Sequence, residues 1–491
     1  MVKMLPSKVN FVLKTYRISP LHAVLYGCML VLLAFSLYYY KLRIFSDTAG
    51  CLTDIVRNDG FTMGHNRFIC FINQLLPAAF VRAHASMKAI VMAYSFNHML
   101  VPVGLALLCM HWLKRPYHAL ALLLQVVLMN VLLFYYAISE LQMGLFLLLF
   151  YDAVADHALE TGRWKTFGIL SLLIPPVLAF SHPMMLLAFT GWLCYRLLKD
   201  KSDYRNTAIA AACFFAGFLI KKTRFTSFYE MERGLTWEKV RPFGLNYLDG
   251  PFAHSVYEYI LKETFMVPLV LLCSIILLAR LRKYTLIGLM LVLVVGIFTL
   301  IVINFENWES HYYDQYYEHM IQPAVFFIVL GFSYGLLRFP GRVWLKAGAV
   351  AIIFIISLAK ISSGSEQHVA RQRWMYGYLE LMDKLQLKKA VVGRIWIPEG
   401  MVRGSFWSSS WESLILSSLE GPEHSKTLFM VWDTDTARIH EPIEATDEFV
   451  TDGWSFKQNT LPTPYFQLGS KPYVILEQVV PDTVLEHLRW K

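Results

Sequence analysis

Long apolar runs alternate with short polar segments over the first 361 residues of the chain. The hydrocarbon core of a bilayer is about 30 Å thick, so a helix that crosses it needs roughly twenty mostly apolar residues. About eleven runs approach that length, and they predict a polytopic α-helical membrane protein. The expected spans are 21–43, 89–112, 117–138, 143–158, 166–180, 184–198, 206–220, 265–281, 284–304, 321–337 and 343–361.

The apolar runs end after residue 361, and a segment of mixed composition follows. The small polar residues at 362–365 predict a hinge between a membrane domain, 1–361, and a soluble domain, 362–491. Alternating helices and strands in the second domain are typical of a small α/β layer structure. The patterns predict helices at 367–387 and 411–419, and strands at 390–397, 427–432 and 473–477.

Basic residues occur in alternate loops between the expected spans. Lys114 and Arg115 lie in one such loop, whereas 306–319 contains no lysine or arginine. Because basic loops stay in the cytoplasm, this distribution predicts a cytoplasmic N-terminus. With an odd number of spans, the C-terminal α/β domain is extracytoplasmic. The first apolar run is too long for a signal-peptide core, so it is expected to remain as a span. Compact loops favour a bacterial inner membrane with a periplasmic active face.

Composition agrees with a chain solvated mainly by lipid, since 56% of the residues are hydrophobic, 16% are charged, and the mean hydropathy is +0.44. Much of the formal charge of +9 lies in short loops, where membrane orientation explains it, so no nucleic-acid partner is expected. No Walker loop, GxGxxG turn, CxxC pair or HExxH helix occurs. Most cysteines fall in apolar runs, but Cys51 and Cys70 form a candidate disulfide in the first outer loop.

The first outer loop, 46–88, holds the leading candidate for chemistry. Asp47 comes directly after the first span and so lies at the membrane surface, where lipid-borne substrates present their head groups. Asp54 follows at helical spacing. Helix caps or solvated loop acids are the alternative interpretation of both residues. Apolar positions from Phe68 to Phe80 repeat with a helical period, which predicts an amphipathic helix on the membrane surface.

Other outer loops add a small set of polar groups. Glu140 lies in the second loop and His182 in the third. A basic trio, Lys221, Lys222 and Arg224, follows the seventh span, which runs against the orientation rule. An anionic phosphate head group at the bilayer surface would explain the trio. Snorkelling of the three side chains to the interface is the alternative.

The outer loop after the ninth span is dense in aromatic and acidic residues. Such a group is typical of an interfacial aromatic belt, but it also suits contact with sugar or lipid. The candidate contact residues are Trp308, His311, Tyr312, Tyr313 and Asp314. A divalent metal ion held by His311, Asp314 and His319 is a further alternative, although their spacing matches no specific template.

This arrangement resembles the GT-C superfamily of membrane glycosyltransferases, which use polyprenyl-phosphate-linked sugars as donors. The resemblance covers nearly the whole chain: the number of spans, the inside N-terminus, the long first outer loop with an acid at its start, and the outward C-terminal domain. Asp47 is followed by Thr48, so the adjacent Asp-Glu pair of some members is absent, as is the WWDYG signature of others. The branch of the superfamily therefore stays open.

The resemblance implies transfer of a hexose or pentose to a saccharide, lipid or protein acceptor at the outer face of the membrane, with or without a divalent metal ion. It implies that Asp47 acts as the general base, with Asp54, Glu140 and His182 as further catalytic or acceptor-orienting candidates. Lys221, Lys222 or Arg224 would then stabilise the departing lipid phosphate.

Two other classes compete with the enzyme. A transporter or flippase for lipid-linked saccharides would use ionisable residues inside the spans, for which Asp152, Asp156 and Asn130 are candidates. A non-catalytic membrane scaffold would use its C-terminal domain to bind a partner. Whether Asp47, Lys221 and the aromatic loop share one outward cavity distinguishes the enzyme from the other two.

Overall fold

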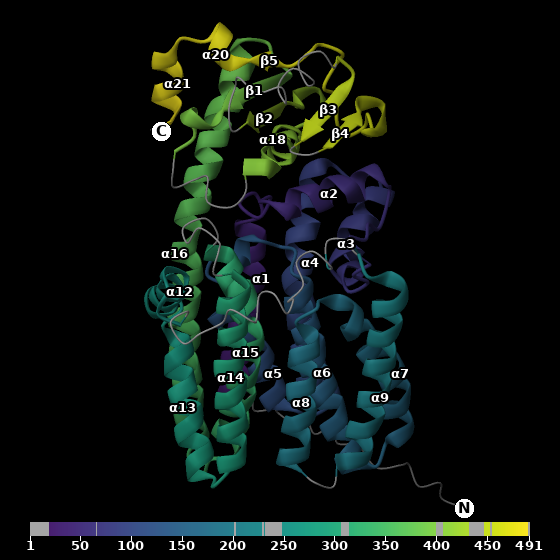
Figure 1. Cartoon of the computed structure of the whole chain (residues 1–491), viewed down its shortest axis with the longest axis vertical. Helices are drawn as coiled ribbons and strands as arrows, with labels where there is room; N and C mark the ends of the chain where they lie inside the picture. Colours follow the sequence, from purple (N-terminus) through teal and green to yellow (C-terminus); the bar gives the residue numbers. More distant parts are fainter. Residues whose placement is uncertain are drawn as a thin grey trace, which may run out of the picture.

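The computed structural model describes residues 19–64, 66–200, 203–227, 230, 248–305, 314–398, 406–431, 446–451 and 454–489, with the backbone alone at 305, 314–316, 406 and 454. Its larger part is a bundle of roughly parallel helices, on one end of which the rest of the chain packs (Figure 1). We call this end of the bundle the upper end, and the opposite end the lower end.

Helices occupy each of the expected spans. The bundle helices are α1 (Pro20–Tyr38), α4 (Met87–Leu107) with its π-helical extension η1 (Leu108–Trp112), α5 (Pro116–Leu128), α6 (Glu140–Thr161), α7 (Trp164–Ser181), α8 (Met185–Lys199), α9 (Tyr204–Ile220) with its extension η4 (Lys221–Phe225), α13 (Met266–Arg280), α14 (Tyr284–Phe305), α15 (Asp314–Arg338) and α16 (Val343–Lys384). Ser19 caps α1, Ser86 caps α4 and Ser139 caps α6, each by accepting a backbone N–H bond.

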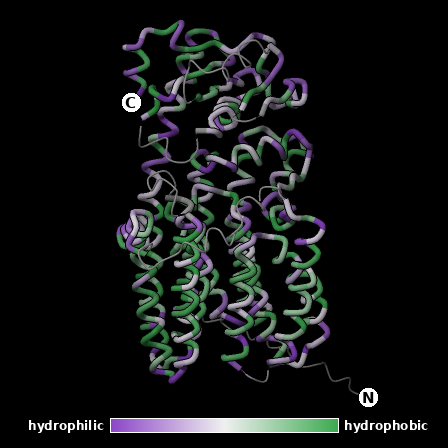
Figure 2. Tube along the Cα trace, viewed as in Figure 1, coloured by the Kyte–Doolittle hydropathy of each residue, from purple (hydrophilic) through white to green (hydrophobic). Residues whose placement is uncertain are grey.

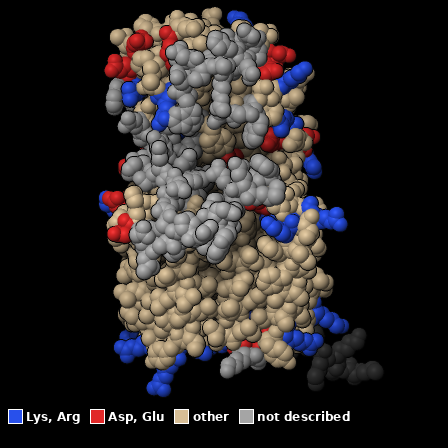
Figure 3. Space-filling view, in the orientation of Figure 1, with Lys and Arg blue, Asp and Glu red and all other residues tan. Residues whose placement is uncertain are grey.

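Within the described residues, six helices are long and apolar enough to cross a membrane, and seven if the bent pair α12 (Pro251–Lys262) and α13, which meet at 78°, forms one span. Length and composition thus establish fewer spans than the eleven expected. Large apolar side chains face outward along the bundle, for example Leu30, Leu172 and Val292, which are 68%, 70% and 69% exposed. The flank drawn in Figure 3 is nearly free of charge, and the bundle is mainly hydrophobic (Figure 2). Such a surface is typical of contact with lipid.

The third expected span ends early, because α5 stops at Leu128 and the chain from 129 to 139 is irregular apart from one 3-10 turn, η2 (Leu133–Tyr135). The buried carboxylate of Glu318 accepts the backbone N–H groups of Leu132 at 2.9 Å and Leu133 at 2.6 Å. Irregular backbone inside a bundle is tolerated only where protein groups satisfy its hydrogen bonds. Glu318 therefore stabilises the segment that leads into α6.

Residues 362–365 are not a hinge, since α16 continues through them without a break. Beyond α16, three parallel strands form a sheet in the order β2-β1-β5, and β3 and β4 form an antiparallel pair that the sequence patterns did not predict. The strands are β1 (Lys389–Gly393), β2 (Thr427–Val431), β3 (Glu448–Thr451), β4 (Trp454–Lys457) and β5 (Val474–Ile475), and the accompanying helices are α18 (Ser409–Ser417), α20 (Leu476–Val479) and α21 (Asp482–Arg489).

The C-terminal elements share a hydrophobic core with the first outer loop, which forms α2 (Asp47–Arg57) and α3 (Cys70–Arg82). Leu52 and Ile55 of α2 are buried with Trp374 of α16 and Trp411 of α18. The hydroxyl of Tyr465 donates to the carbonyl of Val81 at 3.3 Å. The sheet and its helices thus pack directly on the loop that holds Asp47.

Candidate functional site

Asp47 is the first residue of α2 and lies half-buried at the upper end of the bundle. The Tyr136 hydroxyl donates a hydrogen bond to Asp47 Oδ2. Within the described part of the chain, no lysine, arginine or histidine forms an ion pair with Asp47. Removal from water raises the pKa of this carboxyl, and the Glu140 charge adds to that effect. The Tyr136 hydrogen bond and Arg67 oppose it, and together these influences place the pKa at about 6. Asp47 can therefore gain or lose a proton near neutral pH.

The turn before Asp47 is strained, because Ser46 has a positive φ of 57°, which residues other than glycine rarely adopt. The Ser46 N–H donates to Glu412 Oε1 of α18 at 3.1 Å. Arg371 of α16 binds the same carboxylate through two nitrogens, at 2.9 and 3.0 Å, and its guanidinium lies over the Phe45 ring. Side chains from the C-terminal part of the chain thus hold the backbone that orients Asp47.

A second set of charges lies close to Asp47. Arg67 Nη1 is 3.2 Å from Glu140 Oε1, at the first residue of α6. Lys221, the first residue of η4, is 3.0 Å from Glu230 Oε1, and Arg67 Nε is 3.5 Å from the same oxygen. Residues far apart in the sequence are therefore joined through shared carboxylates.

Two histidines complete this group. The rings of His182 and His319 are 5.3 Å apart, and Ser139 Oγ is 3.0 Å from His319 Nδ1. Removal from water lowers the pKa of His182 well below its usual value, and Arg67, His319 and Lys221 lower it further, so the imidazole is neutral. We call this group the upper cluster; its members are Asp47, Arg67, Tyr136, Glu140, His182, Lys221, Glu230 and His319.

The upper cluster brings together five residues singled out in the sequence: Asp47, Glu140, His182, Lys221 and His319. The basic trio does not act as a unit, because Lys221 is buried in the cluster whereas Lys222 and Arg224 are exposed. A π-helical turn of five residues cannot direct all three side chains inward, and the inward place goes to the one with a carboxylate partner.

Asp54, the Cys51–Cys70 pair and the contact candidates of the aromatic loop are not counted among the members of the upper cluster. Asp54 pairs with Arg57 at 2.9 Å, and that guanidinium lies over Phe456, so Asp54 faces the C-terminal strands. Cys51 and Cys70 are both free thiols, so the candidate disulfide between them is not formed. Of the aromatic loop, Trp308, His311, Tyr312 and Tyr313 lie outside the described residues, and Asp314 is described by its backbone alone, as the start of α15.

Three members of the cluster were not predicted as site residues: Arg67, Tyr136 and Glu230. Tyr136 stood inside an expected span, so its hydroxyl was counted as part of an apolar run. Arg67 did leave a signal, since it is a basic residue in a loop expected to face outward, where the orientation rule disfavours cations. Glu230 left none, because an acid in a polar segment is ordinary.

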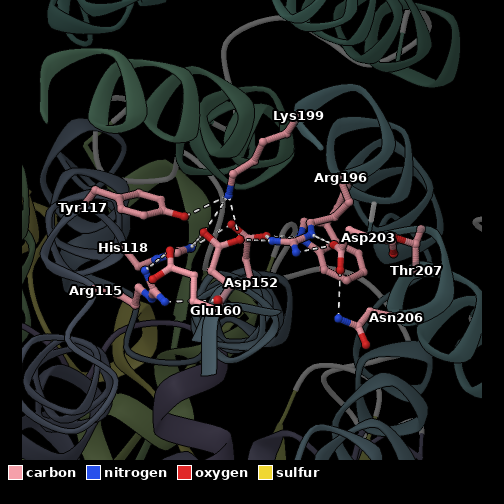
Figure 4. A network of polar contacts seen from close by, with 12 residues as sticks. Arg115, Tyr117, His118, Asp152, Glu160, Arg196, Lys199, Asp203, Asn206 and Thr207 are labelled. Carbon is pink, nitrogen blue, oxygen red and sulfur yellow. Dashed lines mark hydrogen bonds and ion pairs between the residues drawn. The ribbon is translucent and has the colours of Figure 1, made fainter. Parts of the chain in front are cut away.

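A second polar network lies lower in the bundle, between α5, α6, α8 and the start of α9 (Figure 4). Asp152 is fully buried: its Oδ1 accepts from Trp192 at 2.9 Å and from Arg196 at 3.0 Å, and its Oδ2 is 2.8 Å from His118 Nε2. Lys199 donates to both oxygens of Asp156, at 2.8 and 2.6 Å. We call this group the lower network; its members are Tyr117, His118, Asp152, Asp156, Trp192, Arg196, Lys199, Asp203 and Asn206.

The lower network is separated from the upper cluster along α6. Glu140 and Asp152 are twelve positions apart on this helix, which corresponds to about 18 Å at ~1.5 Å per residue. His118, Asp152 and Asp156 are close enough together to hold a metal ion, the one such group found among the described residues. Arg196 and Lys199 already bind the carboxylates, so a cation there would have to displace both and meet their repulsion.

Comparison with known proteins provides no relative for this chain. No protein-family model matches it, and neither a curated protein nor a solved structure is significantly similar to it. The interpretation of the site therefore depends on its own geometry.

Proposed function

We propose that the protein is a membrane glycosyltransferase of the GT-C type, which moves a sugar from a polyprenyl-phosphate-linked donor to an acceptor hydroxyl at the outer face of the membrane. One observation supports this proposal most directly. Asp47, a carboxylate without a paired cation among the described residues, and two buried cations, Arg67 and Lys221, converge at the same end of the helical bundle.

The proposed reaction assigns a separate task to each side of the upper cluster. Asp47 accepts the proton of the acceptor hydroxyl while the oxygen of that hydroxyl attacks the anomeric carbon of the donor. The bond between that carbon and the phosphate oxygen breaks, and its electron pair remains on the phosphate. Arg67 and Lys221 stabilise the negative charge that develops there. Inversion at the anomeric carbon follows from a single displacement.

Glu140 and His182 have positioning roles in this proposal. Glu140 holds Arg67 at 3.2 Å, and its charge helps to raise the pKa of Asp47. His182 is neutral at the working pH, so it can donate to or accept from a sugar hydroxyl without repelling the two cations. Lys222 and Arg224 are exposed and have no part in phosphate stabilisation, and Asp54, paired with Arg57, lies outside the site.

The proposed topology has eleven spans, a cytoplasmic N-terminus and an extracytoplasmic C-terminal α/β domain. It is supported by the helices in each expected range, including those too short or too polar to qualify by themselves. The upper end, where the candidate base lies, then faces the periplasm of a bacterial inner membrane. The donor approaches from the outer leaflet, and the acceptor is a saccharide, lipid or protein.

The transporter alternative receives less support. It needs ionisable residues along a path through the bundle, yet Asp152 and Asp156 are bound to Arg196, Lys199, His118 and Trp192. These carboxylates are already neutralised by neighbouring cations, and breaking such a buried pair is costly, so they have little charge to offer a passing substrate. The scaffold alternative does not explain why no cation in the described part of the chain pairs with Asp47.

The test is transfer by the purified full-length chain with a set of polyprenyl-phosphate-linked sugars. We expect Asp47→Asn to lower the transfer rate by about 100-fold to 10,000-fold, because the amide cannot accept the proton. Asp54→Asn, on the same helix but paired with Arg57, is the matched control and should retain activity. Full activity in Asp47→Asn would overturn the assignment of the base, and no transfer with any donor would overturn the proposed function.

A further inference from the structure

Two cations of the upper cluster converge on a single oxygen. Glu230 Oε1 lies 3.0 Å from Lys221 Nζ and 3.5 Å from Arg67 Nε. All three side chains are nearly inaccessible, with 9% of Arg67, 6% of Lys221 and 6% of Glu230 exposed. Arg67 comes from the first outer loop and Lys221 from the end of α9, so the fold itself creates this meeting point.

A guanidinium and an ammonium around one anionic oxygen form the geometry that proteins use for phosphate as well as for carboxylate. Removing three charged groups from water is costly, and their mutual attraction does not by itself recover that cost. A buried cluster of this kind therefore suggests a use beyond stability. The carboxylate of Glu230 has the charge and the oxygen that a phosphate would supply at this point.

The local backbone brings Glu230 to the cations over a short distance. Lys221 and Glu230 are nine positions apart, and the Glu230 N–H donates to Ser227 Oγ at 3.2 Å. Glu140 binds Arg67 through another nitrogen, Nη1. Loss of Glu230 would therefore leave Lys221 as the buried cation without an anion among the described residues, beside an Arg67 that still has one.

We propose that Glu230 is a stand-in for the substrate phosphate: it occupies the Arg67–Lys221 anion subsite, and the phosphate of a prenyl carrier replaces it. This inference rests on the proposed function for the identity of the ligand. Competition follows directly, because one anion must leave before the other can be bound by the same two cations. A protein without substrate thereby avoids leaving the buried Lys221 ammonium without an anion among the described residues.

The competition distinguishes a stand-in from a purely structural partner. Glu230→Gln removes the competing charge but keeps the size of the side chain, so the subsite should bind phosphate more tightly. Lys221→Gln removes half of the subsite and should weaken binding. If Glu230 instead orders the site through its ion pairs, both substitutions should weaken binding.

The experiment measures the binding of farnesyl phosphate and of inorganic phosphate to the full-length protein in detergent, by titration calorimetry. For farnesyl phosphate we expect Glu230→Gln to lower Kd about tenfold and Lys221→Gln to raise it about tenfold, which corresponds to about one charge-assisted contact each. Lys222→Gln, the exposed neighbour, is the matched control and should leave Kd unchanged. Tighter binding of both ligands to Glu230→Gln identifies a general phosphate subsite, and tighter binding of farnesyl phosphate alone identifies one for the lipid carrier.

Unchanged or weaker binding by folded Glu230→Gln would overturn the proposal. Should that variant fail to fold, Glu230→Asp provides the second test: its shorter carboxylate holds the cations less firmly, so Kd should fall, and a rise in Kd would overturn the stand-in role. The two proposals fail separately. If Glu230→Gln binds phosphate more tightly but the protein transfers no sugar, the stand-in role holds and the glycosyltransferase proposal fails. If the parent protein transfers sugar, Asp47→Asn is inactive and Glu230→Gln gains no phosphate affinity, the glycosyltransferase proposal holds and the stand-in role fails.

Discussion

The upper cluster and the lower network have similar ingredients but differ in how their charges are satisfied. In the lower network, Asp152 has a donor at each oxygen, and Asp156 binds both Arg196 and Lys199. In the upper cluster, the one side-chain partner of Asp47 in the described structure is a neutral hydroxyl. The carboxylates of the lower network are neutralised by neighbouring cations and are therefore poorly suited to bind a ligand. Asp47 has no paired cation among the described residues and can still take up a proton.

The two regions also differ in what they join. The lower network links α5, α6, α8 and the residue before α9, all within the bundle (Figure 4). The upper cluster joins the bundle to the first outer loop, and through Ser46 and Glu412 to the C-terminal elements. We therefore expect damage to the lower network to affect folding, and damage to the upper cluster to affect transfer.

The largest expected effect on stability is that of Arg196→Met. Arg196 is 2% exposed and binds Asp152, Asp156 and Asp203, so its loss weakens the neutralisation of three buried carboxylates, of which Asp156 keeps Lys199. Breaking a buried ion pair in this way costs about 3–5 kcal/mol. The free energy of unfolding, measured by denaturant titration in mixed micelles, should fall by that amount. Arg224→Met, at an exposed arginine, is the control, and equal stability of the two variants would contradict the brace.

The transfer rate and the stability should both depend on pH through Asp47 in the upper cluster. The pKa of Asp47 is about 6, so transfer should fall about tenfold for each pH unit below that value as the base becomes protonated. The folded protein binds this proton more tightly than the unfolded chain, whose value is 3.8. The stabilising contribution is therefore complete below pH 3.8 and is lost as the pH rises through 6.

Asp47→Asn should accordingly raise the thermal unfolding midpoint at pH 8 relative to the parent protein, and the difference should vanish below pH 4. Both measurements need only the purified protein. A transfer rate that is level between pH 5 and pH 8 would show that another group acts as the base.

Glu412 connects the C-terminal part of the chain to Asp47 without contacting it. We expect Glu412→Gln to lower the maximal transfer rate about tenfold with little change in KM for the donor, because the amide holds Arg371 less firmly and the Ser46 turn loosens. The midpoint of the pH profile should move as well, which a purely structural change would not cause. Glu423→Gln, at an exposed acid nearby, is the control. An unchanged pH profile in Glu412→Gln would contradict the positioning role.

The smallest expected effect concerns the strained turn itself. Ser46 has φ 57° and its side chain makes no capping hydrogen bond, so Ser46→Gly should stabilise the fold by about 0.5–1 kcal/mol. Ser86→Gly serves as the comparison, because Ser86 has an ordinary φ of −62° and caps α4; this change should lower stability by a few tenths of a kcal/mol. A loss of stability in Ser46→Gly would show that the turn is not strained.

Sequence patterns predict many of the helices and strands, because a long apolar helix is specified by local composition. Helices occur in each expected span range, in 411–419 and in 367–387, and strands overlap 390–397, 427–432 and 473–477. The failures have particular causes. α5 ends early because a distant carboxylate, Glu318, satisfies an irregular backbone, and α16 continues through small residues because its far half packs against the core around Trp374.

The candidate site likewise has one part that local sequence patterns predict and another that they do not. Local composition is enough to predict that an acid follows the first apolar run, and Asp47 lies there, at the start of α2. Three features depend instead on how remote segments pack: Tyr136 binds Asp47, Lys221 rather than Lys222 points inward, and Arg67 meets Glu230. Ion pairs between remote segments leave no periodicity in the chain, because they depend on how helices pack and not on the residues beside them.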